Sequence, residues 1–174
     1  FRILYVFVAM EVGSRRILHT NVTDHPTAEW TTQQFRAFLE FDHPYRFVIH
    51  DRDSIFSSAL DKALRGFGVR PIRTPFRAPM ANAYCERLIG TVRRECLDYL
   101  IPLNQRHLRA VVKEFVRYYN RGRPHSGLGP GIPEPQAKPP ASVHRHKLPH
   151  GYRVTSTPVL GGLHHEYGLE KEAA

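Results

Sequence analysis

Residues 45–51 read Tyr-Arg-Phe-Val-Ile-His-Asp, an apolar run that ends in a carboxylate. A run of this length and composition predicts a β-strand, with Asp51 just past its last apolar residue. Residues 82–96 read Asn-Ala-Tyr-Cys-Glu-Arg-Leu-Ile-Gly-Thr-Val-Arg-Arg-Glu-Cys, which has the period of an amphipathic helix and carries Glu86 near its start. Asp51 and Glu86 are 35 positions apart, with another predicted helix and strand between them.

An acid at a strand end and an acid on a helix can converge on one divalent cation. The carboxyl edge of a sheet is where α/β proteins bind ligands, and carboxylate oxygens suit Mg²⁺ or Mn²⁺. Asp51 and Glu86 are therefore candidate metal ligands and candidate catalytic residues for cleaving a phosphodiester. Local sequence leaves two alternatives open: Asp51 as a turn-forming residue, and Glu86 as a solvated complement to the helix dipole.

Further elements follow from the pattern of apolar residues and turn residues. The strands are expected at 1–10, 16–22, 45–51 and 69–73, and the helices from 23–26 to 42, from Ser54 or Ser57 to 66, at 82–100 and at 105–120. A hairpin followed by alternating strands and helices predicts an α/β fold, with a mixed sheet and flanking helices.

The chain is expected to hold one core followed by a tail. A length of 174 residues is enough to bury one hydrophobic core, which we assign to residues 1–123. Prolines and glycines crowd residues 124–140, and residues 144–150 are basic. We therefore expect residues 124–174 to form an extended, Pro/Gly-rich basic tail, in which 154–160 has the composition of one short strand.

The charge of the chain points to an anionic partner. The formal net charge is +9 and the pI is near 9.9, which favours nucleic acid. From Arg87 to Arg123, nine basic residues stand against three acids, an array that can bind backbone phosphates. The candidate DNA-binding arginines are Arg77, Arg87, Arg93, Arg94, Arg117, Arg121 and Arg123. The alternative is that such a run only solvates the helix faces.

Several other classes of protein are disfavoured. No apolar run approaches the roughly 18 residues that a membrane span needs, and no signal peptide pattern is present. Cys85 and Cys96 are about 16 Å apart on one predicted helix, too far for a disulfide, so a reducing cytoplasmic location is expected. The sequence has no CxxC pair for zinc and no nucleophile-elbow, P-loop or dinucleotide-binding motif.

Three motifs together resemble the integrase core of bacterial insertion-sequence transposases. They are His-Asp-Arg-Asp-Ser-Ile-Phe at 50–56, the run Arg-Ala-Pro-Met-Ala-Asn-Ala-Tyr-Cys-Glu-Arg from residue 77, and Tyr-Tyr-Asn-Arg-Gly-Arg-Pro-His-Ser-Gly-Leu-Gly from residue 118. The resemblance implies a ribonuclease H-like fold and an Asp-Asp-Glu triad that holds two Mg²⁺ ions. It also implies that Asp51 is the second acid, that Glu86 is the third, and that Asn82 organises the active-site helix and lies on the DNA-binding side.

By this resemblance the chain would cut the 3′ ends of a transposon and join them to target DNA, as a homo-oligomer when full length. The family's first Asp lies on a central strand before the hairpin that here begins at Phe1, no acid precedes Glu11, and Asp24 comes after the hairpin. We therefore expect a core that is incomplete at its N-terminus, exposes strand edges and is inactive alone. A non-catalytic DNA-binding remnant and a ribonuclease H-like hydrolase remain alternatives.

Overall fold

The computed structural model describes residues 2–39, 42–75, 82–129, 131–134 and 148–172. Its contacts divide the chain into two compact units. The first contains Phe1–Met10 with Leu18–Arg109, and the second contains Glu11–Ile17 with Ala110–Ala174. Within the parts of the chain that the structure describes, none of the helices has the length and apolar character that a membrane span requires.

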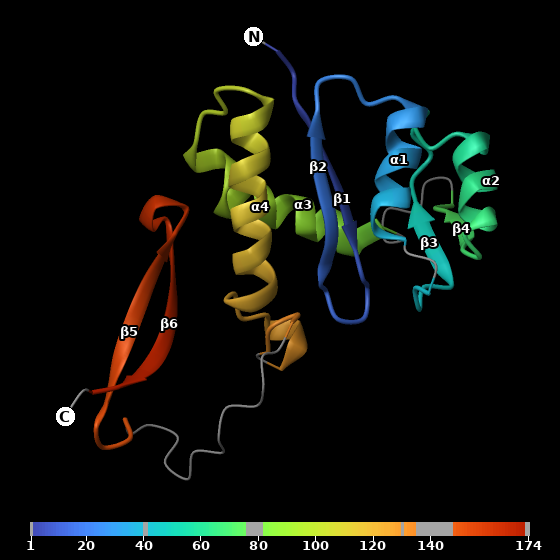
Figure 1. The fold of residues 1–174 in the computed structure, drawn as a ribbon. Helices are drawn as coiled ribbons and strands as arrows, with labels where there is room; N and C mark the ends of the chain where they lie inside the picture. Colours follow the sequence, from blue (N-terminus) through green and yellow to red (C-terminus); the bar gives the residue numbers. More distant parts are fainter. Residues whose placement is uncertain (1, 40–41, 76–81, 130, 135–147, 173–174) are drawn as a thin grey trace. The chain divides into compact units, whose positions relative to one another are not determined.

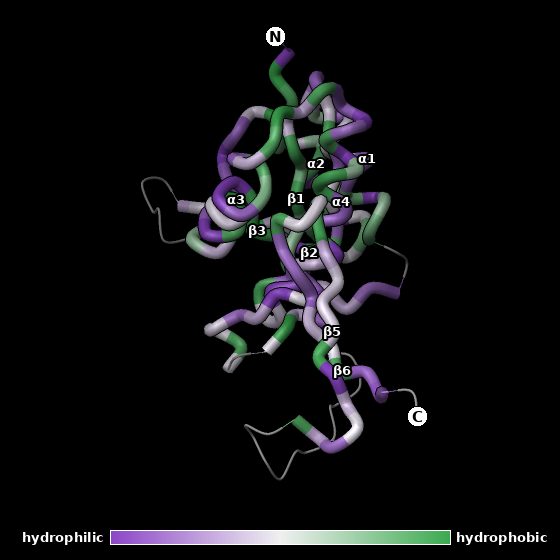
Figure 2. The backbone as a smooth tube through the Cα atoms, turned by 90° about the vertical axis from the view of Figure 1, so that its left-hand side faces the viewer, coloured by the Kyte–Doolittle hydropathy of each residue, from purple (hydrophilic) through white to green (hydrophobic). Residues whose placement is uncertain are grey.

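The strands of the first unit form two small sheets (Figure 1). Strands β1 (Tyr5–Met10) and β2 (Ile17–Thr23) pair as a hairpin, and β1 is the green, hydrophobic stretch near the N-terminus in Figure 2. Strands β3 (Phe47–His50) and β4 (Arg70–Arg73) pair in parallel, with His50 opposite Arg73. Parallel pairing brings the carboxyl ends of β3 and β4 to the same edge, directly before Asp51.

Two capped helices pack against these strands. Helix α1 (Ala28–Phe38) is capped by Thr27, whose hydroxyl accepts a hydrogen bond from the Trp30 N–H at 3.1 Å. The sequence analysis placed this start at residues 23–26, which is too early, because the Thr27 side chain supplies the cap. Helix α2 (Ser58–Gly66) is capped by Ser57, one of the two serines proposed for its start.

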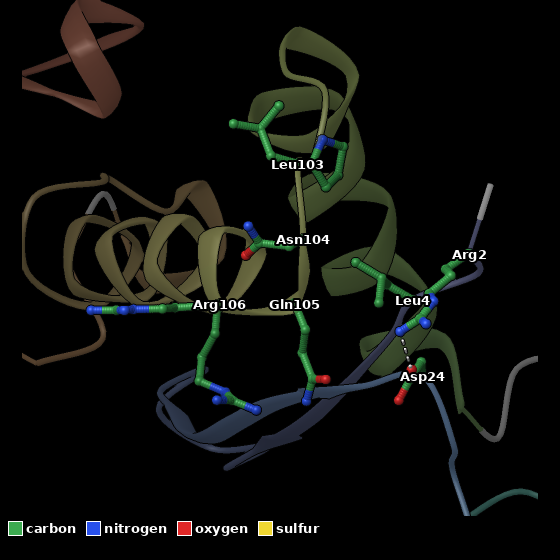
Figure 3. Close-up of a pocket in the computed structure, with 9 residues that line it drawn as sticks. Arg2, Leu4, Asp24, Leu103, Asn104, Gln105 and Arg106 are labelled. Carbon is green, nitrogen blue, oxygen red and sulfur yellow. Dashed lines mark ion pairs between the residues drawn. The ribbon is translucent and has the colours of Figure 1, made fainter.

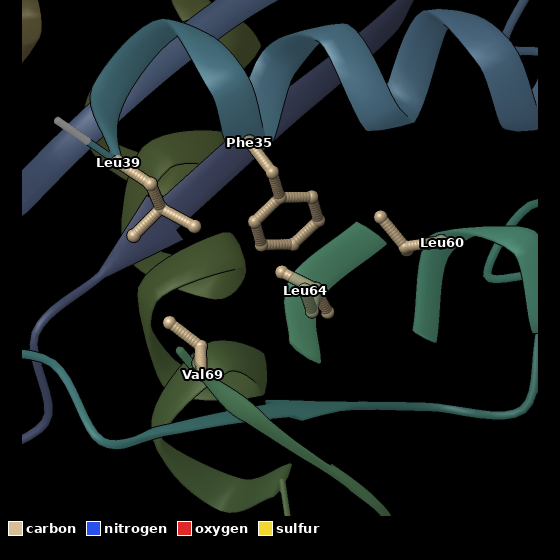
Figure 4. Packing of buried hydrophobic residues seen from close by; sticks show 5 residues of the cluster. All are labelled: Phe35, Leu39, Leu60, Leu64 and Val69. Atoms are coloured by element: carbon tan, nitrogen blue, oxygen red, sulfur yellow. The ribbon is translucent and has the colours of Figure 1, made fainter. Parts of the chain in front are cut away.

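The core of the first unit joins α1, α2 and the start of β4. Its five buried residues are Phe35, Leu39, Leu60, Leu64 and Val69, which point toward one another in Figure 4. Partly buried side chains from the strands pack against this cluster, among them Phe7 of β1 and Val48 of β3. The Phe7 ring lies edge-on to the Phe35 ring, with centroids 5.5 Å apart. The core therefore holds both sheets against α1.

The predicted mixed sheet is present as two separate ladders. Among the described residues β3 pairs only with β4, and β1 pairs only with β2. Phe47 and Ile49, on the opposite face of β3 from Val48, are 50% and 45% exposed. Among the described residues, the edge of β3 that faces away from β4 therefore has no neighbouring strand, and its apolar face is partly exposed.

Helix α3 (Ala83–Glu95) carries Glu86 and follows the two sheets. It ends five residues before the predicted end at Leu100, because Cys96 leaves the helical region at φ −138° and a 3₁₀ turn follows at Leu97–Tyr99. Leu88 and Thr91 are its buried side chains, whereas Ile89 is 49% exposed.

The second unit contains most of helix α4 (Gln105–Arg121) and a C-terminal hairpin. Strands β5 (Tyr152–Val159) and β6 (His164–Lys171) pair antiparallel along their full length. The His164 ring stacks on Tyr118 of α4, with centroids 4.6 Å apart, and the Leu160 N–H donates to the Glu114 carboxylate at 2.7 Å.

This hairpin differs from the extended tail expected over residues 124–174. The short strand anticipated at 154–160 is present as β5, but β6 was not anticipated, because residues 164–171 are mostly polar and lack the alternation of a half-buried strand. The hairpin is held instead by contacts of its turn with α4, which a local sequence pattern does not reveal. Residues 135–147 lie outside the described part of the chain, and the division at residue 123 stays a prediction.

Candidate active site

Asp51 is an exposed residue that directly follows β3. One of its carboxylate oxygens, Oδ1, accepts a hydrogen bond from the Asp53 N–H at 3.0 Å. This is the turn-forming role considered as an alternative, and it fixes the carboxylate at the edge of the β3–β4 ladder. The other oxygen makes no hydrogen bond to a described residue, so turn formation and ligand binding are compatible at Asp51.

Glu86 lies in the first turn of α3 and its side chain is exposed. The N-cap residue of this helix is Asn82, with φ −121° and ψ 17°, and its side chain makes no capping hydrogen bond. The N–H groups of a first helical turn and the helix dipole favour a negative charge at this end. A carboxylate at Glu86 complements the dipole and also extends toward solvent, where a cation can reach it.

The thiol of Cys85, the residue before Glu86, is influenced by both acids. Burial raises the pKa of this half-buried thiol, and the negative charges of Asp51 and Glu86 raise the pKa further. Both carboxylates therefore lie close enough to the Cys85 thiol to disfavour its ionised form. Among the described residues no group of three or more His, Cys, Asp or Glu side chains is placed to hold a metal ion.

Asp51→Asn is expected to lower the pKa of the Cys85 thiol, because it removes one of the negative charges that oppose thiolate formation. At a fixed pH of about 8, near the unperturbed thiol pKa, Cys85 should then react severalfold faster with iodoacetamide. Cys96 is fully buried and should not contribute.

Asp53→Asn is the matched control for that experiment. It removes a carboxylate from the same loop, but the Asp53 charge does not contribute to the raised pKa of Cys85. Cys85 of the Asp53→Asn protein should therefore be alkylated at the same rate as Cys85 of the wild type. Slower or unchanged alkylation of the Asp51→Asn protein would contradict the proximity of Asp51 and Cys85.

The arginines of α3 form an exposed basic surface beside Glu86. Arg87, Arg93 and Arg94 are all exposed. A Cβ atom added to Gly90 would lie 2.9 Å from Nη1 of Arg94, so the absence of a side chain at Gly90 makes room for this guanidinium. The surface suits contact with a phosphate backbone.

The second unit places its three candidate arginines in different surroundings. Arg117 is exposed on α4. Arg121 donates to the Glu134 carboxylate at 2.7 Å, and this hydrogen bond lowers the pKa of Glu134. Arg123 lies over the Tyr119 ring, 5.8 Å from its centroid. Arg121 and Arg123 therefore have partners within the protein, and Arg77 lies outside the described residues.

Asp24 lines a different feature of the first unit. It borders an open pocket of about 880 Å³ with Arg2, Asn104, Gln105 and several other residues, but neither Asp51 nor Glu86 lines it (Figure 3). Asp24 pairs with Arg2 at 3.6 Å and with the His25 ring at 3.0 Å. Its hydrogen bond to His25 lowers the pKa of the Asp24 carboxyl. Asp24 thus has its own partners and its own pocket.

A set of contacts beneath Asp51 was missed by the sequence analysis. The buried His50 ring lies with Nε2 3.0 Å from Asp61 Oδ1 and Nδ1 2.7 Å from the backbone oxygen of Asp51. The other oxygen of Asp61 accepts a hydrogen bond from Arg73 at 2.6 Å. In the sequence, His50 and Arg73 are visible only as polar residues at the ends of two predicted strands. Such residues are too common to identify Arg73 as functional.

Comparison with known proteins finds a family profile that matches one segment of the chain. The family profile "Integrase core domain" matches residues 67–133, a range that contains Glu86 and Asn82 but not Asp51. A comparison with curated proteins found no match. Among solved structures, the catalytic core domain of BIV integrase is similar, with a TM-score of 0.59 and 15% sequence identity over 74% of this chain and 81% of that chain.

The structural similarity extends well beyond the matched segment and confirms the expected fold class. Residues 67–133 therefore match the profile of an integrase core domain, within a chain whose mixed α/β fold is similar to the ribonuclease H-like fold of the BIV integrase catalytic core.

Proposed function

We propose that this chain is the core of a DNA-integrating transposase in which Asp51 and Glu86 hold one Mg²⁺ or Mn²⁺ ion. The observation that supports this proposal is the shared influence of the Asp51 and Glu86 carboxylates on the Cys85 thiol, in a fold similar to an integrase catalytic core. Carboxylate oxygens are the ligands that these cations prefer. When bound, such an ion supplies charge that stabilises the oxygens of a phosphodiester during displacement.

The residues of the chain itself have distinct roles in this proposal. The Asp53 N–H donates a hydrogen bond to Asp51 Oδ1, which leaves the second carboxylate oxygen of Asp51 to bind the cation. Glu86 approaches from α3, and Arg87, Arg93 and Arg94 bind the DNA backbone along the same helix. The bound phosphodiester is thereby oriented over the two carboxylates.

The third carboxylate of the site would come from a strand paired with β3. The outer edge of β3 has no partner among the described residues, and its exposed face carries Phe47 and Ile49. A strand added at this edge would end beside Asp51 if it ran parallel to β3. Residues 1–10 contain no acid that could take this position, so we expect residues 1–174 tested by themselves to join DNA poorly or not at all.

A strand-transfer assay with Mn²⁺, combined with DNA binding measured by fluorescence anisotropy, tests this proposal. The 174-residue protein should bind double-stranded DNA with a strongly salt-dependent affinity and give no detectable joined product. Robust joining would contradict the inactivity of these residues. Cleavage of RNA–DNA hybrids without joining would favour a ribonuclease H-like hydrolase, and a lack of DNA binding would reject the nucleic-acid assignment.

A further inference from the structure

Arg73 ends β4 at the same edge of the first unit as Asp51. In the parallel ladder its register partner is His50, the residue directly before Asp51. Neighbouring strands lie about 5 Å apart, so the backbone of Arg73 is one strand away from the end of β3. Its side chain is 43% exposed. A basic group therefore lies beside a candidate metal ligand, on an element that sequence analysis had not linked to DNA.

The guanidinium of Arg73 is held in place by a buried carboxylate. Asp61 of α2, whose side chain is 10% exposed, accepts one hydrogen bond from Arg73 Nη2 at 2.6 Å. A guanidinium has five N–H donors in a fixed planar fork, and the remaining donors of Arg73 make no hydrogen bond to a described residue. The ion pair thus restricts the side chain and leaves donors for a second acceptor.

His50 extends this support to the backbone of Asp51. Its side chain is 2% exposed, it stacks on Phe56 with ring centroids 4.9 Å apart, and it lies between Asp61 Oδ1 and the Asp51 backbone oxygen. Contacts of about 3 Å from Arg73 through Asp61 and His50 to Asp51 fix the two strand ends relative to each other. A ligand that contacts both Asp51 and Arg73 would therefore bind two side chains whose relative positions are already fixed.

We propose that Arg73 contacts a backbone phosphate of DNA next to the Asp51–Glu86 site, and that Asp61 and His50 are its positioning residues. This inference rests on the proposed function, because it assumes that DNA reaches the carboxyl edge of β3. The chemistry of the contact is a charge-assisted hydrogen bond from a preoriented guanidinium, which is geometrically specific for phosphate oxygens. The competing explanation is that the Arg73–Asp61 pair only ties β4 to α2.

A salt series of DNA-binding measurements separates the two explanations. With a labelled duplex and the 174-residue protein, Arg73→Ala should weaken binding severalfold and reduce the slope of log affinity against log salt by about 0.9, the loss of one phosphate contact. Arg73→Lys keeps the charge and should keep the slope, with an intermediate affinity. Arg70→Ala is the matched control, since Arg70 is an exposed arginine at the other end of β4.

His50→Gln tests the positioning role. DNA cannot touch a side chain that is 2% exposed, so weaker binding at an unchanged salt slope would be the signature of a displaced Arg73. If the role of Arg73 is purely structural, the Arg73 variants should have a lower melting temperature but should bind DNA as tightly as the Arg70→Ala protein. This result would overturn the inference. Failure of the wild type to bind DNA would instead reject the proposed function itself.

Discussion

Leu64→Ala is expected to lower the free energy of unfolding by about 2 to 5 kcal/mol, the range for truncating a fully buried leucine. Leu64 is 0% exposed and lies in the cluster with Phe35, Leu39, Leu60 and Val69. The lost methyl groups remove apolar burial and leave a cavity between α1 and α2. A small protein has only about 5 to 15 kcal/mol of stability, so this single change should remove a large share of it.

Urea unfolding followed by circular dichroism measures this effect. Leu103→Ala is the matched control, because Leu103 is 78% exposed and its truncation should change the stability by no more than about 0.5 kcal/mol. A Leu64→Ala protein as stable as the Leu103→Ala protein would show that the cluster between α1 and α2 is not the core of the first unit.

Asp51→Asn and Glu86→Gln are each expected to weaken Mn²⁺ binding by at least about tenfold, or roughly 1.4 kcal/mol. Each change replaces one of the two carboxylates with a neutral amide of similar shape, so the cation loses a charged ligand while the fold is preserved. Binding can be followed by the loss of the free Mn²⁺ signal in electron paramagnetic resonance. No DNA or catalytic turnover is needed for this measurement.

Asp53→Asn controls for a general loss of negative charge near the site. Asp53 Oδ1 already accepts hydrogen bonds from the Ile55 N–H and the Ser54 hydroxyl, which identify it as a turn residue. Its replacement should leave the Mn²⁺ affinity within about twofold of the wild type, since it is not a proposed ligand. An equal loss for Asp53→Asn and Asp51→Asn would indicate nonspecific attraction of the cation to an acidic loop.

The order of the elements around the site was predictable from local patterns. The apolar run before Asp51 and the helical period around Glu86 each depend on neighbouring residues, and both elements are present in the structure. Amphipathic periods reflect a buried face, and the caps and turns are chosen by residues close in sequence. Helix ends were less accurate, as the Thr27 cap and the early end of α3 show.

Contacts between distant residues were not predictable in the same way. The Arg73–Asp61–His50 set joins three elements, and no spacing in the sequence reveals it. Strand β6 depends on pairing with β5 and on the stacking of His164 on Tyr118, so its polar sequence does not predict a strand. Separation of the β1–β2 and β3–β4 ladders also depends on which strands are neighbours, which hydrophobic patterning does not encode.

A double-mutant cycle on Mn²⁺ affinity tests the central claim, that Asp51 and Glu86 share one cation. The wild type, Asp51→Asn, Glu86→Gln and the combined variant would be titrated with Mn²⁺ under one set of conditions. For a shared ion, we predict one bound Mn²⁺ per wild-type chain and a combined variant that loses little more than either single variant. Additive losses from two independent sites, or a wild type that binds no Mn²⁺, would contradict the claim.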